Sequence, residues 1–390
     1  MSTARPGTQN RTQHRAQNRT QHRAQNRTQH RTQNRTLRVG IAGGGAIFRN
    51  HLEAYRALQD VEVVALCDID AERAGAVAAA HGIQHAFGSV TDLLAWRGAD
   101  GRGIDLISVC TPHPTHEAVV TEAAAAGVHV LCEKPIAIDL EAAERMVVAC
   151  REASVTFGVL FQRRFWPAAQ RIRAAIDDGT LGTPILGHCS VLLHREPEYY
   201  SATDWRGTWA SDGGGVLMTQ GIHYIDLLQW FMGEVVEVHG HMATFVHGDH
   251  IEVEDSAVAT LRFASGAIAT VQASTAVTPS LGVQVRVTGS TGATAQVTEF
   301  PEGTDGRVDI WAAGDSVGAQ ETWPSSLNPN VDLAAINGAL IPWHRAQVAD
   351  FVDAVRTGGT PAVTGEEATK SLRILLAVYE SSRTGKPVVF

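Results

Sequence analysis

A glycine cluster and a downstream acid have the spacing of a dinucleotide-binding site. An apolar stretch of strand type, residues 37–42, leads into three glycines at 43–45, and a helix is expected to follow to about residue 58. Gly43 permits a tight turn, and Gly45 lets the backbone approach a pyrophosphate held at the helix N-terminus. A glycine cluster alone is also typical of an ordinary loop, so the strand and helix around it carry the argument.

The acid is Asp68, which ends a second expected strand at 61–67 and lies 23 residues after Gly45. A carboxylate at this place accepts the ribose hydroxyls of NAD and repels the 2′-phosphate of NADP. Residues 69 and 70 are Ile and Asp, so neither is an arginine that offsets this repulsion. The sixth position of the fingerprint departs from the pattern, because it is Phe48 instead of a small residue. We therefore predict NAD as the cofactor.

Two further strand ends bring polar residues to the same crevice. A strand expected at 104–110 continues into the stretch from Thr111 to His116, and a strand at 128–132 ends in Glu133 and Lys134. Ligands of open parallel sheets bind beyond the carboxyl ends of the strands. Three strand ends that converge on one crevice are stronger support for a cofactor site than any single motif.

The composition of the 390 residues, 44% hydrophobic and 19% charged, is typical of a globular protein. No apolar run approaches the roughly 18 residues that span a bilayer, and no signal-peptide core is present, so we expect a cytoplasmic protein without a membrane partner. The five cysteines are scattered and form no CxxC pair. This distribution predicts free buried thiols and no metal site.

The first 36 residues form a separate low-complexity segment. From residue 8 to 35 the chain repeats a four-residue unit seven times, such as TQNR and AQNR, with no apolar face. We expect disorder here, and an incidental extension is favoured over a nucleic-acid or membrane tether. Beyond the segment, 24 basic residues face 41 acidic ones, a net charge of −17 that repels nucleic acid.

Several motifs resemble the Gfo/Idh/MocA family, named for glucose-fructose oxidoreductase, inositol dehydrogenase and a rhizopine-catabolism protein. The similarity covers nearly everything after the repeat. The matching segments are GGGAI (43–47), CTPHPTH (110–116), CEKPIA (132–137), FQRRFWPA (161–168), GTLGTP (179–184), DGGGVLMTQGIHYIDLLQWFMG (212–233) and GEEATKSLRILLAVYESSRTGKPV (365–388).

The resemblance implies an α/β protein: a Rossmann domain at 37–161, then an α+β domain at 162–390 with a large, open, mostly antiparallel sheet. The C-terminal helices are expected to pack back on the Rossmann domain. The sequence supports the sheet separately, since residues 253–263 alternate, a Ser-Gly turn follows, and 267–274 return. Strands at 283–288 and 293–298 continue it. Related proteins are expected to cover such a sheet by forming homodimers or homotetramers.

The resemblance also implies the residues that do the chemistry. Lys134 would lie beside the reacting carbon, where burial lowers the pKa of its amine. His223 would act with it as acid or base, since imidazole titrates near neutral pH. In the inositol-dehydrogenase branch an aspartate stands four residues before this histidine, whereas here that residue is Thr219. We expect Thr219 to contact the substrate, and Asp226 either to orient His223 or to pack structurally.

Residues at the domain junction are candidates for ligand contacts. Arg163 and Arg164 are expected to meet nicotinamide or substrate, and Trp205 beside Arg206 suits a sugar ring with a carboxylate or phosphate. An ordinary domain interface is an equal alternative for these residues. The cofactor-binding residues predicted are Gly43, Gly45, Ala46, Ile47, Asp68, Thr111, Pro112, His113, His116, Glu133, Lys134 and Arg163; the substrate-binding residues predicted are Arg164, Trp205, Arg206 and Thr219.

The function predicted is NAD-dependent hydride transfer at a ring hydroxyl or ketone of a sugar, sugar derivative or polyol. The 218–233 segment is most similar to the branch that acts at the 3-position of sugar-nucleotide uronic acids, and glycoside 3-dehydrogenation is close to it. Two alternatives remain at this point. One is an NAD-dependent glycoside hydrolase that works through transient oxidation, and the other is a non-catalytic NAD-binding regulator.

Overall fold

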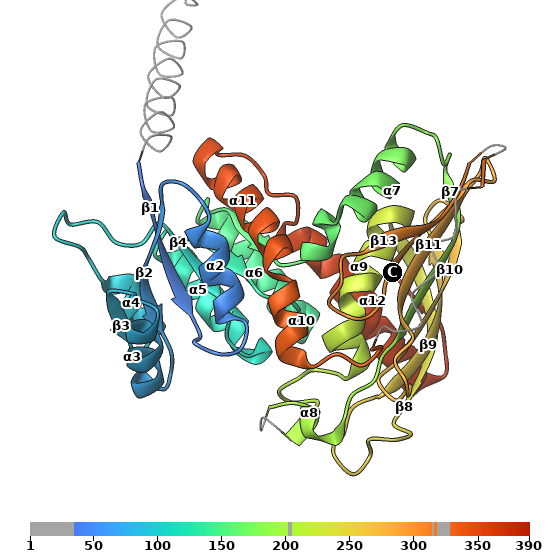
Figure 1. Ribbon diagram of the computed structural model, residues 1–390, viewed down its shortest axis with the longest axis horizontal. Coiled ribbons are helices and arrows are strands. Elements are labelled where there is room, and N and C mark those ends of the chain that lie inside the picture. Colours follow the sequence, from blue (N-terminus) through green and yellow to red (C-terminus); the bar gives the residue numbers. More distant parts are fainter. Residues whose placement is uncertain (1–34, 202–204, 314–315, 318–327) are drawn as a thin grey trace, which may run out of the picture.

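The computed structural model describes residues 35–201, 205–313, 316–317 and 328–390. Two sheets, one in each half of the chain, stand apart with helices between them (Figure 1). Of the predicted low-complexity segment at 1–36, all but Arg35 and Thr36 lies outside the described residues. The described helices include none that is both long and apolar enough to cross a membrane.

The first sheet has six parallel strands in the order β3-β2-β1-β4-β5-β6. This order places β1 at the centre of the sheet and creates the switch point at which open α/β sheets bind ligands. The strands are β1 (Leu37–Ala42), β2 (Val61–Cys67), β3 (His85–Phe87), β4 (Leu106–Val109), β5 (His129–Cys132) and β6 (Phe157–Val159).

Helices connect these strands, and side-chain caps fix where several begin. The Asp70 carboxylate accepts the backbone N–H of Arg73, and the Asp139 carboxylate accepts that of Ala142, which satisfies free donors in the first turns. The helices are α2 (Phe48–Arg56), α3 (Ala71–Ala80), α4 (Val90–Ala95), η1 (His113–Thr115), α5 (His116–Ala125), α6 (Leu140–Glu152) and η2 (Gln162–Phe165).

The second sheet has nine strands in the order β14-β13-β12-β11-β7-β10-β9-β8-β15, antiparallel except between β7 and β10. Together with the first sheet, it confirms the predicted fold class. Its strands are β7 (Pro184–Leu192), β8 (Val235–Ala243), β9 (Ser256–Phe263), β10 (Ile268–Ser274), β11 (Gly282–Gly289), β12 (Thr294–Glu299), β13 (Arg307–Ala313), β14 (Ser316–Val317) and β15 (Val388–Val389).

One predicted strand is shorter than expected. It begins at Ser256 instead of residue 253, because the two preceding acids turn inward to bind backbone donors. Glu254 accepts the N–H groups of Gly215 and Leu217, and Asp255 accepts three N–H groups of the loop at 245–247. Alternation predicted the apolar positions but not this use of the acids.

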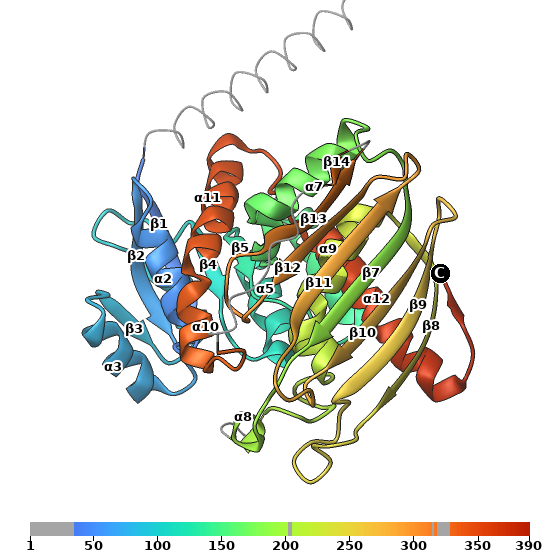
Figure 2. The same cartoon turned by 45° about the vertical axis from the view of Figure 1, so that its right-hand side comes forward.

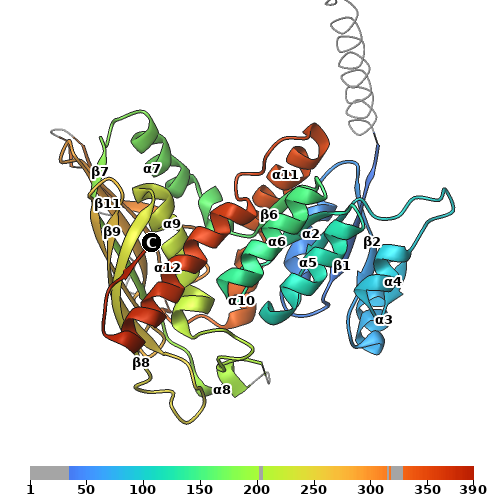
Figure 3. The same cartoon turned by 180° about the vertical axis from the view of Figure 1, so that it is seen from behind.

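Helices cover only one face of the second sheet. Helix α9 (Ile222–Met232) packs on β7 and β11, and α12 (Gly365–Thr384) packs on β8 and against α6 (Figure 3). Helix α7 (Pro167–Asp177) lies on the same side, and α8 (Pro197–Ser201) lies at one end. No helix of the described chain lies on the opposite face, which is turned toward the viewer in Figure 2.

The C-terminal part of the chain returns to the first sheet. Helix α10 (Leu333–Ala339) and helix α11 (Ile341–Thr357) lie between the two halves (Figure 1), and α11 packs on α2. The Asn50 side chain donates to the Asn337 carbonyl over 2.8 Å. At the end of β6, the Gln347 side chain donates to the Val159 carbonyl and accepts the Phe161 N–H. These contacts place α10 and the start of α11 over the glycine turn.

Candidate active site

A cavity of about 880 Å³ lies at the carboxyl edge of the first sheet. This volume is in the upper part of the range for cofactor and ligand sites. One wall is the glycine turn with the ends of β2, β4 and β5. A second wall comes from the chain after η2 and from the π-helical turn η3 (Leu217–Gly221), and a third comes from α10 and the start of α11.

The glycine turn has the form that a pyrophosphate site requires. Gly43 has φ of +97°, and a Cβ there would lie 2.6 Å from the Cys110 carbonyl oxygen, so only glycine fits. A Cβ on Gly45 would meet no atom within 4 Å, because this backbone faces the open cavity. Ala46 and Ile47 line the cavity beside it. Phe48, which departs from the fingerprint, is 3% exposed and packs in the core.

Asp68 lines the cavity beside this turn, but it is not a free carboxylate. Its Oδ2 accepts the Gly44 N–H at 2.9 Å and the Arg73 Nε–H at 3.1 Å, while Arg73 also donates to Oδ1. Burial alone would raise the pKa of Asp68, but these hydrogen bonds lower it on balance. Residues 69 and 70 offer no arginine, but the first turn of α3 brings Arg73, three residues further along the chain, back onto the acid.

The end of β4 contributes Thr111, Pro112 and His113 to the cavity wall. His113 is buried, and its Nδ1 lies 3.1 Å from the Asp212 carbonyl oxygen. Burial, His116 and Lys134 lower the pKa of His113 to about 3, so the ring is neutral. His116 is fully buried outside the cavity lining, with Nε2 2.9 Å from the Thr111 carbonyl and Nδ1 3.0 Å from that of Pro135.

Glu133 lies in a buried hydrogen-bond chain. Its Oε1 is 2.9 Å from Nε2 of His51, whose Nδ1 is 3.0 Å from the Ser108 hydroxyl. His344 approaches the same carboxylate oxygen at 3.5 Å, and Oε2 accepts the Lys134 backbone N–H at 3.1 Å. Burial would raise the pKa of Glu133, but hydrogen bonds from both histidines hold it well below its usual range. These hydrogen bonds therefore fix the backbone from which the Lys134 side chain extends.

His51, Glu133 and His344 each place one potential metal-ligand atom within 4.8 Å of the others. The scattered cysteines predicted no metal site, and neither histidine belongs to a predicted motif. Both ring nitrogens of His51 are engaged in the hydrogen-bond chain, so hydrogen bonding accounts for its position.

Lys134 extends into the cavity, where its Nζ donates to the Thr219 carbonyl oxygen at 2.9 Å. Burial lowers the pKa of this amine to about 8, with smaller contributions from the positive charges of Arg163 and Arg206. An amine with that pKa is partly neutral near physiological pH and can accept a proton.

His223 lines the same cavity and is 5% exposed. Its Nδ1 is buried and has no hydrogen-bond partner among the described residues. Burial, followed by the charges of Arg163 and Lys134, lowers the pKa of His223 well below its usual value. The imidazole is therefore neutral near physiological pH, and the described residues leave one of its nitrogens unpartnered.

Comparisons with known proteins agree with this geometry. Residues 37–161 match the model of an oxidoreductase family with an NAD-binding Rossmann fold, and residues 169–295 match the GFO/IDH/MocA C-terminal domain. The chain belongs to the GFO/IDH/MocA family. It is an NAD-dependent dehydrogenase, as the motif resemblance predicted.

Several relatives match over most of their length. The crystal structure of the WlbA dehydrogenase from Bordetella pertussis, in complex with NADH and UDP-GlcNAcA, is 31% identical and covers 91% of this chain and 99% of its own, with a TM-score of 0.77. A 1,5-anhydro-D-fructose reductase from Ensifer adhaerens is 30% identical, over 90% of this chain and 97% of the relative. A D-apiose dehydrogenase from Paraburkholderia graminis is 29% identical, over 89% and 88%.

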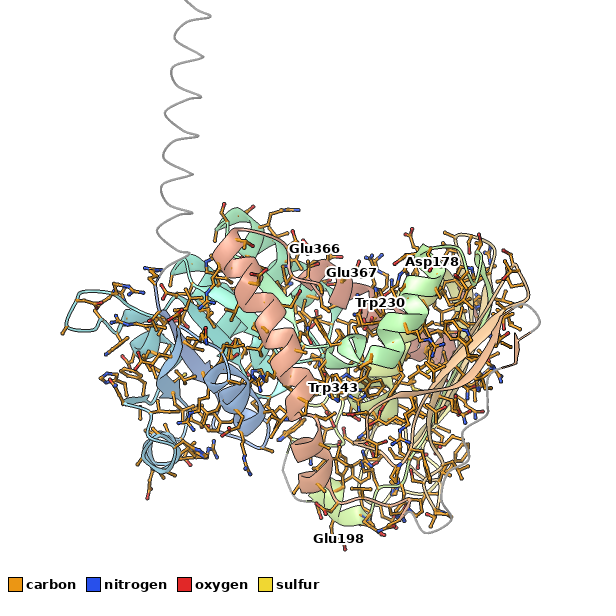
Figure 4. All side chains as sticks on the ribbon, turned by 45° about the horizontal axis from the view of Figure 1, so that its top comes forward. Asp178, Glu198, Trp230, Trp343, Glu366 and Glu367 are labelled. Atoms are coloured by element: carbon orange, nitrogen blue, oxygen red, sulfur yellow. The ribbon has the colours of Figure 1, made fainter. Side chains whose placement is uncertain are left out.

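Within this GFO/IDH/MocA dehydrogenase, two predicted roles do not agree with the geometry. Arg164 is not at the cavity, because its guanidinium forms a buried ion pair with Asp226 at 2.7 and 2.8 Å and also contacts Glu367. Of the two alternatives open for Asp226, the geometry favours structural packing over orienting His223, because the ion pair and Ser371 engage its carboxylate. His116 joins two strand-end loops through their carbonyl oxygens instead of facing the cofactor. Glu367 and Trp230, whose ring lies 5.3 Å from Arg164, are labelled in Figure 4.

The other predicted residues do line the cavity. Arg163 is 4% exposed, pairs with Glu299, and keeps NH1 without a partner among the described residues. Thr219 offers the carbonyl that holds Lys134, while its hydroxyl donates to the Gly215 carbonyl at 2.8 Å. Trp205 and Arg206 also lie on the wall, whereas Asp204, their neighbour in the sequence motif, lies outside the described residues.

Sequence reasoning missed several residues of this wall. Some of them come from segments far from the predicted motifs, so no spacing signal points to them: Tyr199, Arg195, Glu302 and His344. The others lie close to predicted residues in the chain, but the motif alone did not show that they face the cavity: Arg73, Gln220 and Tyr224.

Proposed function

We propose that the cavity oxidises or reduces a ring CH–OH group of a sugar or polyol, with Lys134 and His223 in contact with the reacting oxygen. The observation that carries this is the pair itself: an amine with its pKa lowered to about 8 and a neutral imidazole with an unpartnered nitrogen line one cavity with the glycine turn. Relatives that are sugar or polyol dehydrogenases support the substrate class.

The cofactor half would hold NAD through Gly43, Gly45, Ala46 and Ile47 at the pyrophosphate and through Asp68 at the ribose. Thr111, Pro112, His113, Glu133 and Arg163 line the path from there to Lys134. Bound NAD supplies the hydride acceptor. This fit rests on the bare backbone at Gly45, where the cavity meets no side chain.

The chain's own residues then handle the proton. In oxidation, the substrate hydroxyl gives its proton to the neutral amine of Lys134 at Nζ while the carbon gives up a hydride with its electron pair, and a C=O bond forms. The Thr219 carbonyl accepts a hydrogen bond from Nζ and fixes its direction. His223 hydrogen-bonds the reacting oxygen and orients it. Reduction is the reverse, with ammonium as the proton donor.

We propose the 3-position of a glycoside, uronic acid or sugar nucleotide as the reacting carbon, with Thr219, Trp205 and Arg206 as substrate contacts. The structural neighbour that is 31% identical binds NADH and UDP-GlcNAcA, which supports this class. Thr219 occupies the position at which the inositol-dehydrogenase branch has an aspartate, and this difference disfavours an inositol as the substrate.

The test is a turnover screen of the purified chain with NAD against pyranosides, uronic acids, sugar nucleotides and inositols. NADH absorbance and product mass would be followed together. We expect NADH to form in step with a ketone two mass units lighter than the substrate. Cleaved glycoside without net NADH would favour the hydrolase alternative, and ligand binding without any chemistry would favour the regulator.

We further propose a cytoplasmic homodimer or homotetramer. The five cysteines are free and buried, which supports a reducing compartment. The uncovered face of the second sheet exposes Leu186, Val258 and Ile268 by half or more of their surface, on the neighbouring strands β7, β9 and β10. Light scattering would test the oligomer, and charged substitutions at Leu186 and Ile268 should dissociate it.

A further inference from the structure

The cavity wall opposite the glycine turn carries three arginines whose electrostatic environments differ. Arg163 is paired with Glu299 at 3.1 and 3.4 Å, and Arg195 is paired with Glu302 at 2.8 and 2.7 Å. Both pairs are buried, so each positive charge is balanced by the protein itself. The third, Arg206, has no carboxylate partner among the described residues.

Arg206 is nevertheless held in place by its surroundings. Its guanidinium carbon lies 4.3 Å from the Tyr199 ring centre and 5.1 Å from the Trp205 ring centre, and NH1 donates to the Tyr199 carbonyl at 3.3 Å. Its Nε is buried without a partner. A guanidinium stacked on aromatic rings has already lost much of its freedom, so it binds an anion at a small entropic cost.

Among the described residues, Asp212 is an acid that acts on Arg206 without pairing with it. Asp212 and Arg206 interact electrostatically, but they form no ion pair, and Oδ2 of Asp212 is used by the Gly207 N–H at 3.0 Å. Burial raises the pKa of Asp212 to about 6, so this carboxylate is protonated more readily than an ordinary aspartate as pH falls. Arg206 also contributes to lowering the pKa of Lys134, so the two cations are within electrostatic reach of each other.

A second feature of the same cavity points to a ligand with polar groups. Gln162 is 3% exposed and lines the cavity, and its Oε1 has no donor among the described residues. A buried amide oxygen without a donor costs free energy unless a bound molecule supplies one. The wall therefore offers an acceptor for a sugar hydroxyl and, at Arg206, a donor fork for an anion.

We propose that the substrate is an anionic sugar whose carboxylate or phosphate is bound by Arg206, rather than a neutral sugar or polyol. This deepens the proposed function and rests on it. The planar guanidinium of arginine can donate two parallel hydrogen bonds to a carboxylate or to a phosphate. The ligand group predicted is therefore an anion with two oxygens that accept hydrogen bonds side by side. The two sources are a uronic carboxylate on the reacting ring and the phosphate of a sugar phosphate or sugar nucleotide.

The experiment compares substrates that are matched except for one anionic group. It uses the NAD-loaded full chain, with kcat/KM measured for a glucoside against the glucuronide and for glucose against glucose 1-phosphate. A third pair is UDP-GlcNAc, which already carries a diphosphate, against its uronate, which adds the carboxylate. We expect the wild type to have a higher kcat/KM for the member with the additional anionic group in at least one pair. The pair that shows this preference identifies whether the carboxylate or the phosphate is bound. A wild type without preference in any pair overturns the proposal.

Variants then assign the preference to Arg206. Arg206→Gln should lower the anionic-to-neutral ratio of kcat/KM by about 10-fold to 100-fold, the scale of a charged hydrogen bond, mainly through KM. Arg206→Lys should restore part of the ratio, because it keeps the charge without the fork. Arg151→Gln removes the same charge from the exposed surface of α6 and should leave the ratio unchanged. Equal losses on neutral and anionic members in Arg206→Gln would show a merely structural arginine.

A binding readout separates this proposal from the catalytic one. The Lys134→Met variant loaded with NADH would be titrated with the preferred anionic sugar by calorimetry. We expect binding that is retained in Lys134→Met and weakened by adding Arg206→Gln. If the wild type turns over no sugar but Arg206-dependent binding is observed, the anion site is supported and the proposed catalysis is wrong. Binding that ignores Arg206 would overturn the anion site even if catalysis holds.

Discussion

The two halves of the cavity are built in different ways. The cofactor half comes from residues 43–134, mostly strand ends of one sheet, and presents bare backbone with few charges. The substrate half is assembled from segments that lie more than 100 residues apart, and buried ion pairs fix it: Arg163 with Glu299 and Arg195 with Glu302. A change in the first half should therefore affect cofactor affinity, whereas a change in the second should affect stability and turnover.

Buried ion pairs explain this sensitivity. Removing one partner leaves an uncompensated charge in a site that water does not reach, at a cost of about 3–5 kcal/mol. The glycine turn of the cofactor half carries no such liability, since Gly43 and Gly45 present backbone instead of charged side chains. The buried charges of this half are confined to Asp68 with Arg73 and to Glu133 with its two histidines. The predictions below test the contrast between the halves.

The largest expected effect is at the junction of the halves. Lys134→Met keeps the length of the side chain but removes the proton acceptor, so turnover should fall by about 100-fold or more. Lys134→Arg should not rescue it, because guanidinium does not deprotonate. NAD affinity, measured by calorimetry, should barely change. A loss of NAD affinity as large as the loss of turnover would make Lys134 a cofactor anchor instead.

Arg164 provides the matching test on the substrate side. Arg164→Met leaves Asp226 buried and unpaired, so we expect a loss of roughly 3–5 kcal/mol in the free energy of unfolding. The double variant Arg164→Met with Asp226→Leu should recover much of that loss. Denaturant unfolding measures both. If Arg164→Met is as stable as the wild type but has a raised KM, Arg164 contacts the substrate and the structural role proposed for it is wrong.

The pH profile distinguishes Lys134 from His223. The family resemblance implies that His223 acts as acid or base near neutral pH, but burial lowers the pKa of that ring so far that it stays neutral. The titrating group is then Lys134, with its pKa near 8, and oxidation should rise as pH increases through this value because the neutral amine is required. His223→Gln should reduce turnover by about 100-fold while keeping the limb. Loss of the limb in this variant would contradict the assignment.

These cases show which parts of the site a sequence can predict. The glycine turn, Asp68 and Lys134 belong to contiguous motifs, so their neighbours in the chain are also their neighbours in space. Both Arg164 and Arg206 are arginines that stand in or beside a family motif. Arg164 has a buried carboxylate partner 62 residues away, whereas Arg206 has none in the part of the chain that the structure describes. The fate of a charged side chain depends on its distant partner, and alternation or spacing does not encode that.

A smaller effect is expected in the cofactor half. Asp68→Ala should weaken NAD by about 10-fold, since charged hydrogen bonds to the ribose hydroxyls are lost. It also frees the Arg73 guanidinium, which should then bind the 2′-phosphate of NADP. The ratio of NAD affinity to NADP affinity should therefore fall. Asp68→Ala with Arg73→Gln should lose that gain. Calorimetry with both cofactors tests this, and an NADP affinity in the double variant equal to that in Asp68→Ala would exclude Arg73.

The smallest expected effect lies at the entrance to the first strand. Deleting residues 1–34 removes the repeat but keeps Arg35, which pairs with Asp105 through a side chain that is 39% exposed. Stability and turnover should be unchanged, because the deleted sequence has no apolar face to bury. Deleting 1–36 also removes this half-exposed pair, which should cost at most about 1 kcal/mol, since the Arg38 backbone N–H still donates to Asp105 at 2.9 Å. Thermal unfolding of the two truncations side by side measures the difference. A large loss already in the 1–34 deletion would show that the repeat contacts the folded protein, and a large loss only in the 1–36 deletion would show that Arg35 anchors β1.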